Sequence, residues 1–179
     1  VEALPELPDL AAAPLDRVLA LWAGLGYYAR ARNLHRAAAT CVEQHDGRLP
    51  ETLQALVELP GIGRSTAGAI LAQAHGMRVA ILDGNVKRVL ARFHAVEGWP
   101  GAPAVEKRLW ELSHSHLPHE RLADYTQAIM DLGATLCRRR RPECTKCPFA
   151  GDCAAHLQGR SGDLPGARPV RKVPRRSSV

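Results

Sequence analysis

The chain has 179 residues, a formal net charge of +6 at pH 7, and 46% hydrophobic residues. This length suits one sizeable domain or two small ones, and the hydrophobic fraction is sufficient for a buried core. The composition excludes a membrane-spanning protein, because no run approaches the roughly eighteen apolar residues that a span requires.

The positive charge is concentrated near the end of the chain. Residues 1–136 carry 13 basic and 15 acidic side chains, whereas residues 137–159 carry 5 and 2, and residues 160–179 carry 6 and 1. We therefore expect a nearly neutral body and a basic C-terminal quarter. Such placement favours a nucleic-acid partner more strongly than the high isoelectric point alone.

The periodicity of apolar residues predicts helices throughout. Residues 1–10 contain two prolines and are expected to form a loop. Helical spacing then recurs in residues 14–23, 29–45, 51–59, 65–75, 84–96, 103–113 and 119–137. No segment alternates as a strand does, so the predicted fold class is all-α. Residues 160–179 are rich in Arg, Pro, Ser and Gly and are expected to form a linker or tail.

Two of these helices, 51–59 and 65–75, meet at a turn with glycines at positions 61 and 63. Pro60 biases the preceding residue away from helical angles, and Gly61 can adopt a positive φ. Without side chains at Gly61 and Gly63, a phosphate could approach the positive N-terminal end of the second helix. The turn thus predicts a helix-hairpin-helix that binds a nucleic-acid backbone without reading bases. The alternative is an ordinary helix–helix corner, whose turn also often contains glycine.

Asp83 stands immediately before a predicted helix and beside Gly84. Its simplest role is an N-cap, which Asp performs well. A carboxylate held by helix N–H groups also stays ionised and rigid, which suits it to stabilise a positive charge beside it. The two roles are compatible.

Four cysteines are spaced C-x6-C-x2-C-x5-C between residues 137 and 153: Cys137, Cys144, Cys147 and Cys153. This clustering indicates metal ligation, by either zinc or an iron–sulfur cluster, and spacing alone does not separate the two. The fifth, Cys41, lies on the apolar side of its helix and is expected to be buried. His114, His116 and His119 lack thiolate or carboxylate partners at suitable spacing, so we interpret them as surface residues.

Taken together, the hairpin turn, the Asp83-Gly84-Asn85 segment and the cysteine quartet resemble the endonuclease III superfamily of base-excision DNA glycosylases. Within it, residues from about 15 to 157 resemble the adenine DNA glycosylase family. The resemblance implies a helix-hairpin-helix glycosylase fold, as a partial six-helix barrel, with a [4Fe-4S] cluster on the four cysteines in a C-terminal loop. It implies that Asp83 stabilises the sugar cation and that Asn85 hydrogen-bonds near the same sugar.

The resemblance also separates two branches of the superfamily. In the endonuclease III branch, the position of Ser65 is a lysine that forms a Schiff base and cuts the strand. A serine cannot form an imine, which implies a monofunctional glycosylase that uses water as its nucleophile. The alternatives are an endonuclease III-like pyrimidine glycosylase with lyase activity, or a DNA-binding module without catalysis.

The segment that begins Gly26-Tyr27-Tyr28 resembles the part of the adenine branch that wedges into the duplex. Tyr27 is the candidate wedge, because an inserted ring compensates for the unstacking that base flipping requires. The residues expected to contact DNA are Tyr27, Arg30, Arg32, Gly61, Gly63, Arg64, Ser65, Thr66, Lys87, Arg138 and Arg139.

The expected organisation has three parts: a helical domain over residues 1–120, a cluster domain over 121–158, and a basic linker or tail over 159–179. The expected partner is double-stranded DNA with adenine opposite 8-oxoguanine or guanine, bound by a monomer in the bacterial cytoplasm at the nucleoid. Family members carry a catalytic glutamate upstream of the hairpin and a C-terminal Nudix-like domain, and no part of this sequence resembles either. We therefore expect the sequence to be a fragment that binds DNA weakly and releases little adenine.

Overall fold

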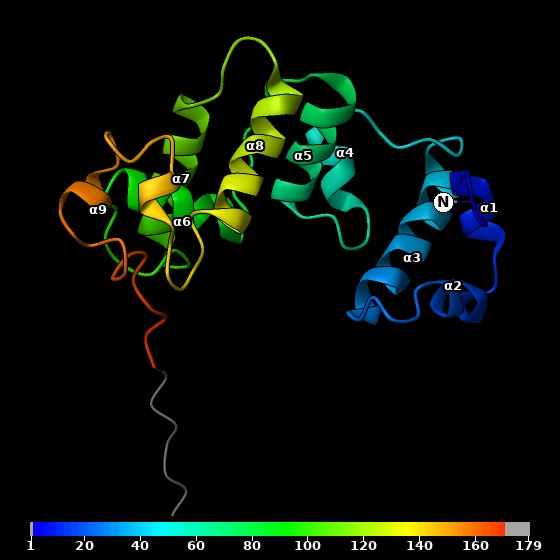
Figure 1. Cartoon of the computed structure of the whole chain (residues 1–179). Coiled ribbons are helices and arrows are strands. Elements are labelled where there is room, and N and C mark those ends of the chain that lie inside the picture. The colour runs from blue at the N-terminus through cyan, green and yellow to red at the C-terminus, as the bar shows by residue number, and fades with distance from the viewer. Residues whose placement is uncertain (1, 171–179) are drawn as a thin grey trace, which may run out of the picture. The chain divides into compact units, whose positions relative to one another are not determined.

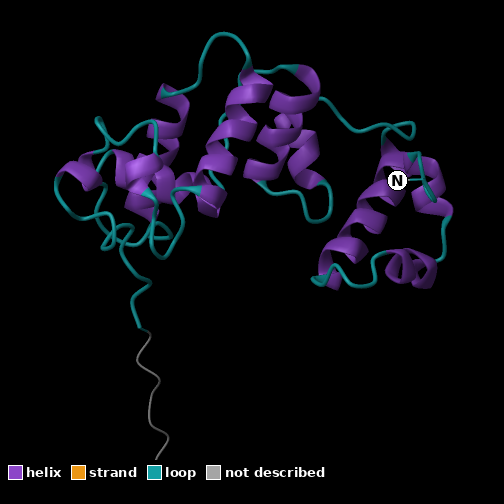
Figure 2. Cartoon of the chain, viewed as in Figure 1, coloured by secondary structure: helices purple, strands orange, loops and turns teal. Residues whose placement is uncertain are grey.

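The computed structural model describes residues 2–170, which form helices and loops with no strand (Figures 1 and 2). This confirms the predicted all-α class for the described residues. The elements are α1 (Leu7–Ala12), α2 (Leu15–Leu21), α3 (Tyr28–Gln44), α4 (Leu53–Glu58), α5 (Arg64–His75), α6 (Gly84–Phe93), α7 (Pro103–Ser115), α8 (Leu122–Thr135), the 3₁₀ turn η1 (Cys144–Lys146) and α9 (Ala154–Leu157).

The expected loop over residues 1–10 is the main error of the sequence prediction, because α1 begins within it. Pro8 lies in the first turn of α1, where its missing N–H costs nothing. Glu6 and Asp9 form a capping box, in which each side chain accepts a hydrogen bond from the other residue's backbone N–H. The helix then packs against α3. Proline here starts a helix instead of preventing one.

The chain divides after Val79 into two compact units, which we call the N-terminal unit and the C-terminal unit. In the N-terminal unit, one apolar cluster joins α3, the end of α4, and α5. Its buried members are Ala37, Cys41, Leu56, Leu59, Ala67 and Leu71. The pairs 37/41 and 67/71 each lie one helical turn apart, so each helix turns one stripe towards the cluster. Cys41 is buried, as expected.

The C-terminal unit is organised around α6, which contacts α7, α8 and α9. A buried loop segment, residues 80–82, leads into α6, and Ser113 Oγ of α7 donates a hydrogen bond of 2.7 Å to the Ile81 carbonyl. Helices α6 and α8 approach closely at Gly133, where an added Cβ would lie 2.6 Å from Asn85 Cβ. These contacts fix the start of α6, and with it Asp83.

Part of the expected tail is packed on the C-terminal unit. Leu164 is only 4% exposed, and the Gly166 N–H donates to the Gly98 carbonyl at 3.0 Å. Arg160 forms an ion pair of 2.8 Å with Glu97. The Arg168 guanidinium lies 5.3 Å from the centre of the Trp99 ring, so the segment up to residue 168 lies against the loop that follows α6. Residues 171–179 lie outside the described residues, and the domain boundaries expected at residues 120 and 158 remain a prediction.

Candidate functional site

The hairpin turn between α4 and α5 has the backbone that its glycines predict. Gly61 has φ +81°, and an added Cβ there would lie 2.6 Å from Asn33 Cβ of α3. The Ile62 N–H closes the turn on the Leu59 carbonyl at 3.1 Å. Gly63 is extended, caps α5, and has open space where a Cβ would stand. Gly61 is thus required by both conformation and space, whereas Gly63 leaves the approach to α5 unobstructed.

The N-terminus of α5 is accessible to a ligand. Gly61, Gly63, Arg64 and Thr66 are exposed and Ser65 is half-buried. The first turn of α5 contains no acidic residue to occupy the positive end of the helix dipole. An anion such as a phosphate could therefore be held here by backbone N–H groups. Contact of these residues with DNA stays a prediction.

Tyr27 is an exposed aromatic side chain on a constrained backbone. It precedes α3 with φ +49° in the left-handed region, and 79% of it is exposed. The indole N–H of Trp22 donates to the Gly26 carbonyl at 2.9 Å, and the Arg30 guanidinium lies 5.1 Å from the centre of the Tyr27 ring. Arg32, two residues after Arg30 in α3, is also exposed. This geometry suits insertion of the ring between base steps, the role predicted for it.

Asp83 is the N-cap of α6, as predicted. Its Oδ1 accepts the Val86 N–H at 2.8 Å, and its Oδ2 accepts a longer hydrogen bond of 3.4 Å from the Asn85 side chain. Two donors therefore hold the carboxylate in one orientation at the start of a helix. The structure brings the two predicted catalytic residues together, and Lys87 of the same turn forms an ion pair of 2.6 Å with Glu106.

A chain of hydrogen bonds connects Asp83 with the first cysteine. The Asn85 side-chain oxygen accepts from Arg88 Nη2 at 2.8 Å, and Arg88 Nε donates to the Cys137 carbonyl at 2.7 Å. Arg88 Nη2 also donates to the Gly133 carbonyl at 2.7 Å. Burial lowers the pKa of Arg88, and the opposite charge of a Cys137 thiolate raises it. Arg88 thus ties the start of α6 to the end of α8.

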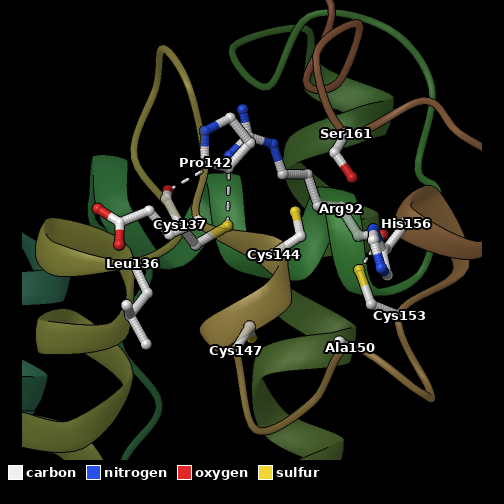
Figure 3. A pocket seen from close by; sticks show the side chains of 11 residues that line it. Arg92, Leu136, Cys137, Pro142, Cys144, Cys147, Ala150, Cys153, His156 and Ser161 are labelled. Carbon is white, nitrogen blue, oxygen red and sulfur yellow. Dashed lines mark hydrogen bonds between the residues drawn. The ribbon is translucent and has the colours of Figure 1, made fainter.

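All four predicted metal-binding cysteines line one pocket of the C-terminal unit (Figure 3). Cys137 follows α8, Cys144 opens the 3₁₀ turn, Cys147 follows it, and Cys153 precedes α9. Burial raises the pKa of the Cys153 thiol, while backbone N–H groups at the start of α9 lower it.

The arrangement of the thiols indicates what the pocket could hold. Among the described residues, no three His, Cys, Asp or Glu side chains are placed to ligate a single metal ion. A zinc site would require four sulfurs at about 2.3 Å from one point. The thiols surround a space that Arg92 and Ser161 also line. Four thiolates on one pocket are a donor set for either a zinc ion or an iron–sulfur cluster.

The loop that contains the cysteines is basic and exposed. Arg138, Arg139, Arg140 and Arg141 are all exposed. Glu143 is paired with Arg138 and with Lys146, whose Nζ lies 2.7 Å from its Oε2, and the hydrogen bond from Lys146 holds the pKa of Glu143 below its usual range. The other arginines give the loop a positive surface suited to phosphates.

The sequence analysis missed three residues of this site: Arg88, Arg92 and Ser161. One signal could have identified the arginines. Asn85, Arg88 and Arg92 are spaced i, i+3 and i+7 and therefore share one face of a helix otherwise rich in apolar residues. No sequence signal identifies Ser161.

No helix within residues 2–170 is both long and apolar enough to cross a membrane. His116, which we interpreted as a surface residue, is exposed, and its Nε2 lies 2.7 Å from that of His94.

Comparisons with known proteins identify the family of this chain. Residues 1–115 match the model of the HhH-GPD superfamily base excision DNA repair proteins. An adenine DNA glycosylase of Buchnera aphidicola subsp. Acyrthosiphon pisum is 37% identical over 174 residues, which cover 97% of this chain and 50% of that protein. The adenine DNA glycosylase of Homo sapiens is 42% identical over 175 residues, covering 94% of this chain and 32% of that protein. The chain thus spans half or less of the length of these relatives.

Solved structures confirm the helix-hairpin-helix glycosylase fold. A thermostable thymine-DNA glycosylase superimposes with a TM-score of 0.75 at 28% identity, over 86% of this chain and 70% of that one. A non-covalent endonuclease III–DNA complex superimposes with a TM-score of 0.73 at 24% identity, over 88% of this chain and 72% of that one.

Proposed function

We propose, since the chain belongs to the HhH-GPD superfamily of base excision DNA repair proteins, that it provides the DNA-binding turn and the charge-stabilising carboxylate of an adenine DNA glycosylase. Relatives named adenine DNA glycosylase match nearly its whole length. The substrate is double-stranded DNA in which adenine lies opposite 8-oxoguanine or guanine. The protein acts as a monomer, in the cytoplasm at the bacterial nucleoid.

The proposed reaction hydrolyses the bond between adenine and its deoxyribose. The bonding electrons leave with adenine, which gains a proton, and a water molecule supplies the oxygen that joins the sugar. Positive charge develops on the sugar before water adds, and a carboxylate fixed beside it lowers the energy of that state. Asp83 is the candidate, because its two hydrogen bonds hold it rigidly at the start of α6.

Ser65 supports a reaction without strand cleavage. A hydroxyl cannot form an imine with the sugar, so water remains the nucleophile. The Gly61–Gly63 turn and the start of α5 hold a phosphate, Tyr27 enters the base stack, and Arg138 and Arg139 contact phosphates of the DNA backbone. Exposure of these groups supports their roles.

We infer that the four cysteines hold a [4Fe-4S] cluster. Support comes from the convergence of all four cysteines on one pocket. When bound, the cluster supplies a rigid anionic centre that shapes the loop. The chain's own contribution to DNA binding is the row of exposed arginines in that loop.

The observation on which this proposal rests is the hydrogen-bonded carboxylate of Asp83. Its charge can be tested by DNA binding, without measuring turnover. Two duplexes are compared, each with a sugar mimic opposite 8-oxoguanine: one a protonated pyrrolidine, the other a neutral tetrahydrofuran. The protein should bind the cationic duplex more tightly, because it resembles the charged transition state. Asp83→Asn preserves the N-cap, since Asn caps as well as Asp. We expect it to reduce the preference roughly tenfold by removing a charge-assisted contact.

The matched control is Asp131→Asn, which removes the same charge from an exposed position on α8. It should leave the preference for the cationic duplex unchanged. Equal binding of both duplexes by the unaltered protein, or a preserved preference in Asp83→Asn, would reject the assignment of Asp83.

A further inference from the structure

Arg92 is a buried cation whose charge no carboxylate balances within residues 2–170. It lies on α6, is 2% exposed, and makes its hydrogen bonds to carbonyls and one sulfur. Nε donates to the Leu164 carbonyl at 2.8 Å, Nη1 to the Arg138 carbonyl at 2.8 Å, and Nη2 to the Arg139 carbonyl at 3.2 Å. Carbonyls satisfy the donors but bring no net negative charge. A buried charge in this position is costly unless an anion lies nearby.

The remaining contacts of Arg92 point towards the cysteine pocket. Its Nη1 lies 3.3 Å from Cys137 Sγ and 3.3 Å from the Cys137 carbonyl. Figure 3 shows the guanidinium beside Cys137, on the wall of the pocket that the four cysteines share. The side chain thus bonds to a predicted cofactor ligand and to the segment that contains Leu164.

Ser161 brings a second donor to the same pocket. Its Oγ is buried and has no hydrogen-bond partner among the described residues, and Ser161 lines the pocket together with Arg92 (Figure 3). A buried hydroxyl without a partner is destabilising, and such groups are rare in native proteins. An acceptor in the pocket would satisfy it.

We propose that Arg92 and Ser161 donate hydrogen bonds to the sulfur centre held by the four cysteines, raise its reduction potential, and couple it to the 160–166 segment. This inference rests on the cluster proposed above. Both are positioning residues, since neither contacts the reacting sugar. Each bond, and the charge of Arg92, favours the more negative reduced state, so the potential rises. The coupling follows because Arg92 also holds Leu164, and Ser161 itself belongs to the segment.

The decisive variant is Ser161→Ala. The hydroxyl has no hydrogen-bond partner among the described residues, so its removal should not lower the free energy of unfolding. We expect unchanged helical content and iron content but a lower reduction potential, measured by equilibrium redox titration of the cluster's absorbance. Ser115→Ala is the matched control, because its hydroxyl bonds to the Leu112 carbonyl of α7 instead. It should leave the potential unchanged.

Variants of Arg92 separate charge from geometry. Arg92→Gln should lower the potential further than Ser161→Ala does, whereas Arg92→Lys, which keeps the charge, should lower it less than Arg92→Gln. Arg108→Gln removes a charge from an exposed ion pair with Glu111 and controls for net charge alone. Amide exchange in residues 160–166 should quicken roughly tenfold in Arg92→Gln, because the bond to Leu164 is lost.

The outcomes separate failure of this inference from failure of the cofactor proposal. Zinc, or no metal, in the unaltered protein would reject the cluster itself. A cluster present in the unaltered protein with the same potential in Ser161→Ala and Arg92→Lys would overturn this inference alone. If Arg92→Gln does not retain iron, the reduction potentials of Ser161→Ala and Arg92→Lys still test the inference.

Discussion

The two units carry their candidate functional features in different ways. In the N-terminal unit, the features are backbone conformations at exposed turns: Gly61 and Tyr27 both have positive φ, at +81° and +49°. In the C-terminal unit, they are side chains: Asn85 and Arg88 link Asp83 to the Cys137 carbonyl, and Arg92 of the same helix contacts Cys137 Sγ. The first kind depends on which residues can adopt a rare conformation. The second depends on charge and on what the cysteines hold. Substitutions should therefore damage the two units by different mechanisms.

The largest expected effect is in the C-terminal unit, in Cys147→Ser. Loss of one of four ligands should abolish stable iron binding and unfold the loop around η1, since metal binding supplies folding free energy. Iron analysis, together with amide exchange across residues 137–153, measures both consequences. A variant that kept its full iron content and its slow exchange would contradict the ligand assignment.

Cys41→Ala is the matched cysteine variant in the N-terminal unit. Cys41 is fully buried in the apolar cluster, where burial raises the pKa of its thiol. Its truncation should lower the free energy of unfolding by about 1–2 kcal/mol through lost packing. Iron content should not change. An equal loss of iron in Cys41→Ala and Cys147→Ser would show that iron loss reports general unfolding.

The next effect in size concerns the backbone of the hairpin turn. In Gly61→Ala, the new Cβ would stand 2.6 Å from Asn33 Cβ, at φ +81°. We expect a loss of about 2–3 kcal/mol in the free energy of unfolding, from strain and from the forced shift of α3. DNA affinity should fall as well. Thermal denaturation and fluorescence anisotropy with a labelled duplex measure the two losses.

Gly63→Ala tests the same turn without the strain. Gly63 has an ordinary extended backbone and open space at its Cβ position. The cost should stay below about 1 kcal/mol, because alanine is a poorer N-cap than glycine. Equal destabilisation by Gly61→Ala and Gly63→Ala would mean that the close approach to Asn33 does not restrict residue 61.

The same difference explains what could be predicted from the sequence. The hairpin turn, the Asp83 cap and the cysteine spacing are local patterns, each contained in fewer than about twenty residues, and each predicts its own conformation. Seven of the helices follow from apolar periodicity for the same reason. Helix α1 was missed because two prolines suggest a loop, whereas Pro8 occupies the one part of a helix that tolerates it.

The connections in the C-terminal unit could not be predicted. Arg92 bonds to carbonyls 46 and 72 positions further along the chain, at Arg138 and Leu164. Nothing local identifies such partners, because they depend on how α6, α8 and the 160–166 segment pack. For the same reason, Ser161 looked like one serine in a polar tail. Tertiary packing, not composition, determines which polar residues in this unit are buried.

The smallest expected effect is a pH dependence of stability in the C-terminal unit, where His94 follows α6. Burial lowers the pKa of His94 below 6.5, and the neighbouring His116 and Arg108 lower it further. Below pH 6.5 the unfolded chain therefore binds a proton that the folded chain resists. Stability from this group is complete above pH 6.5 and is lost as the pH falls through the folded pKa.

His94→Gln keeps a polar group beside His116 but cannot titrate. Between pH 7.5 and about 5, just below the ordinary His pKa, its Tm should fall less than the Tm of the unaltered protein. Identical Tm curves for the two proteins would mean that His94 has the same pKa in the folded and unfolded states, and that the pH response of the C-terminal unit arises elsewhere.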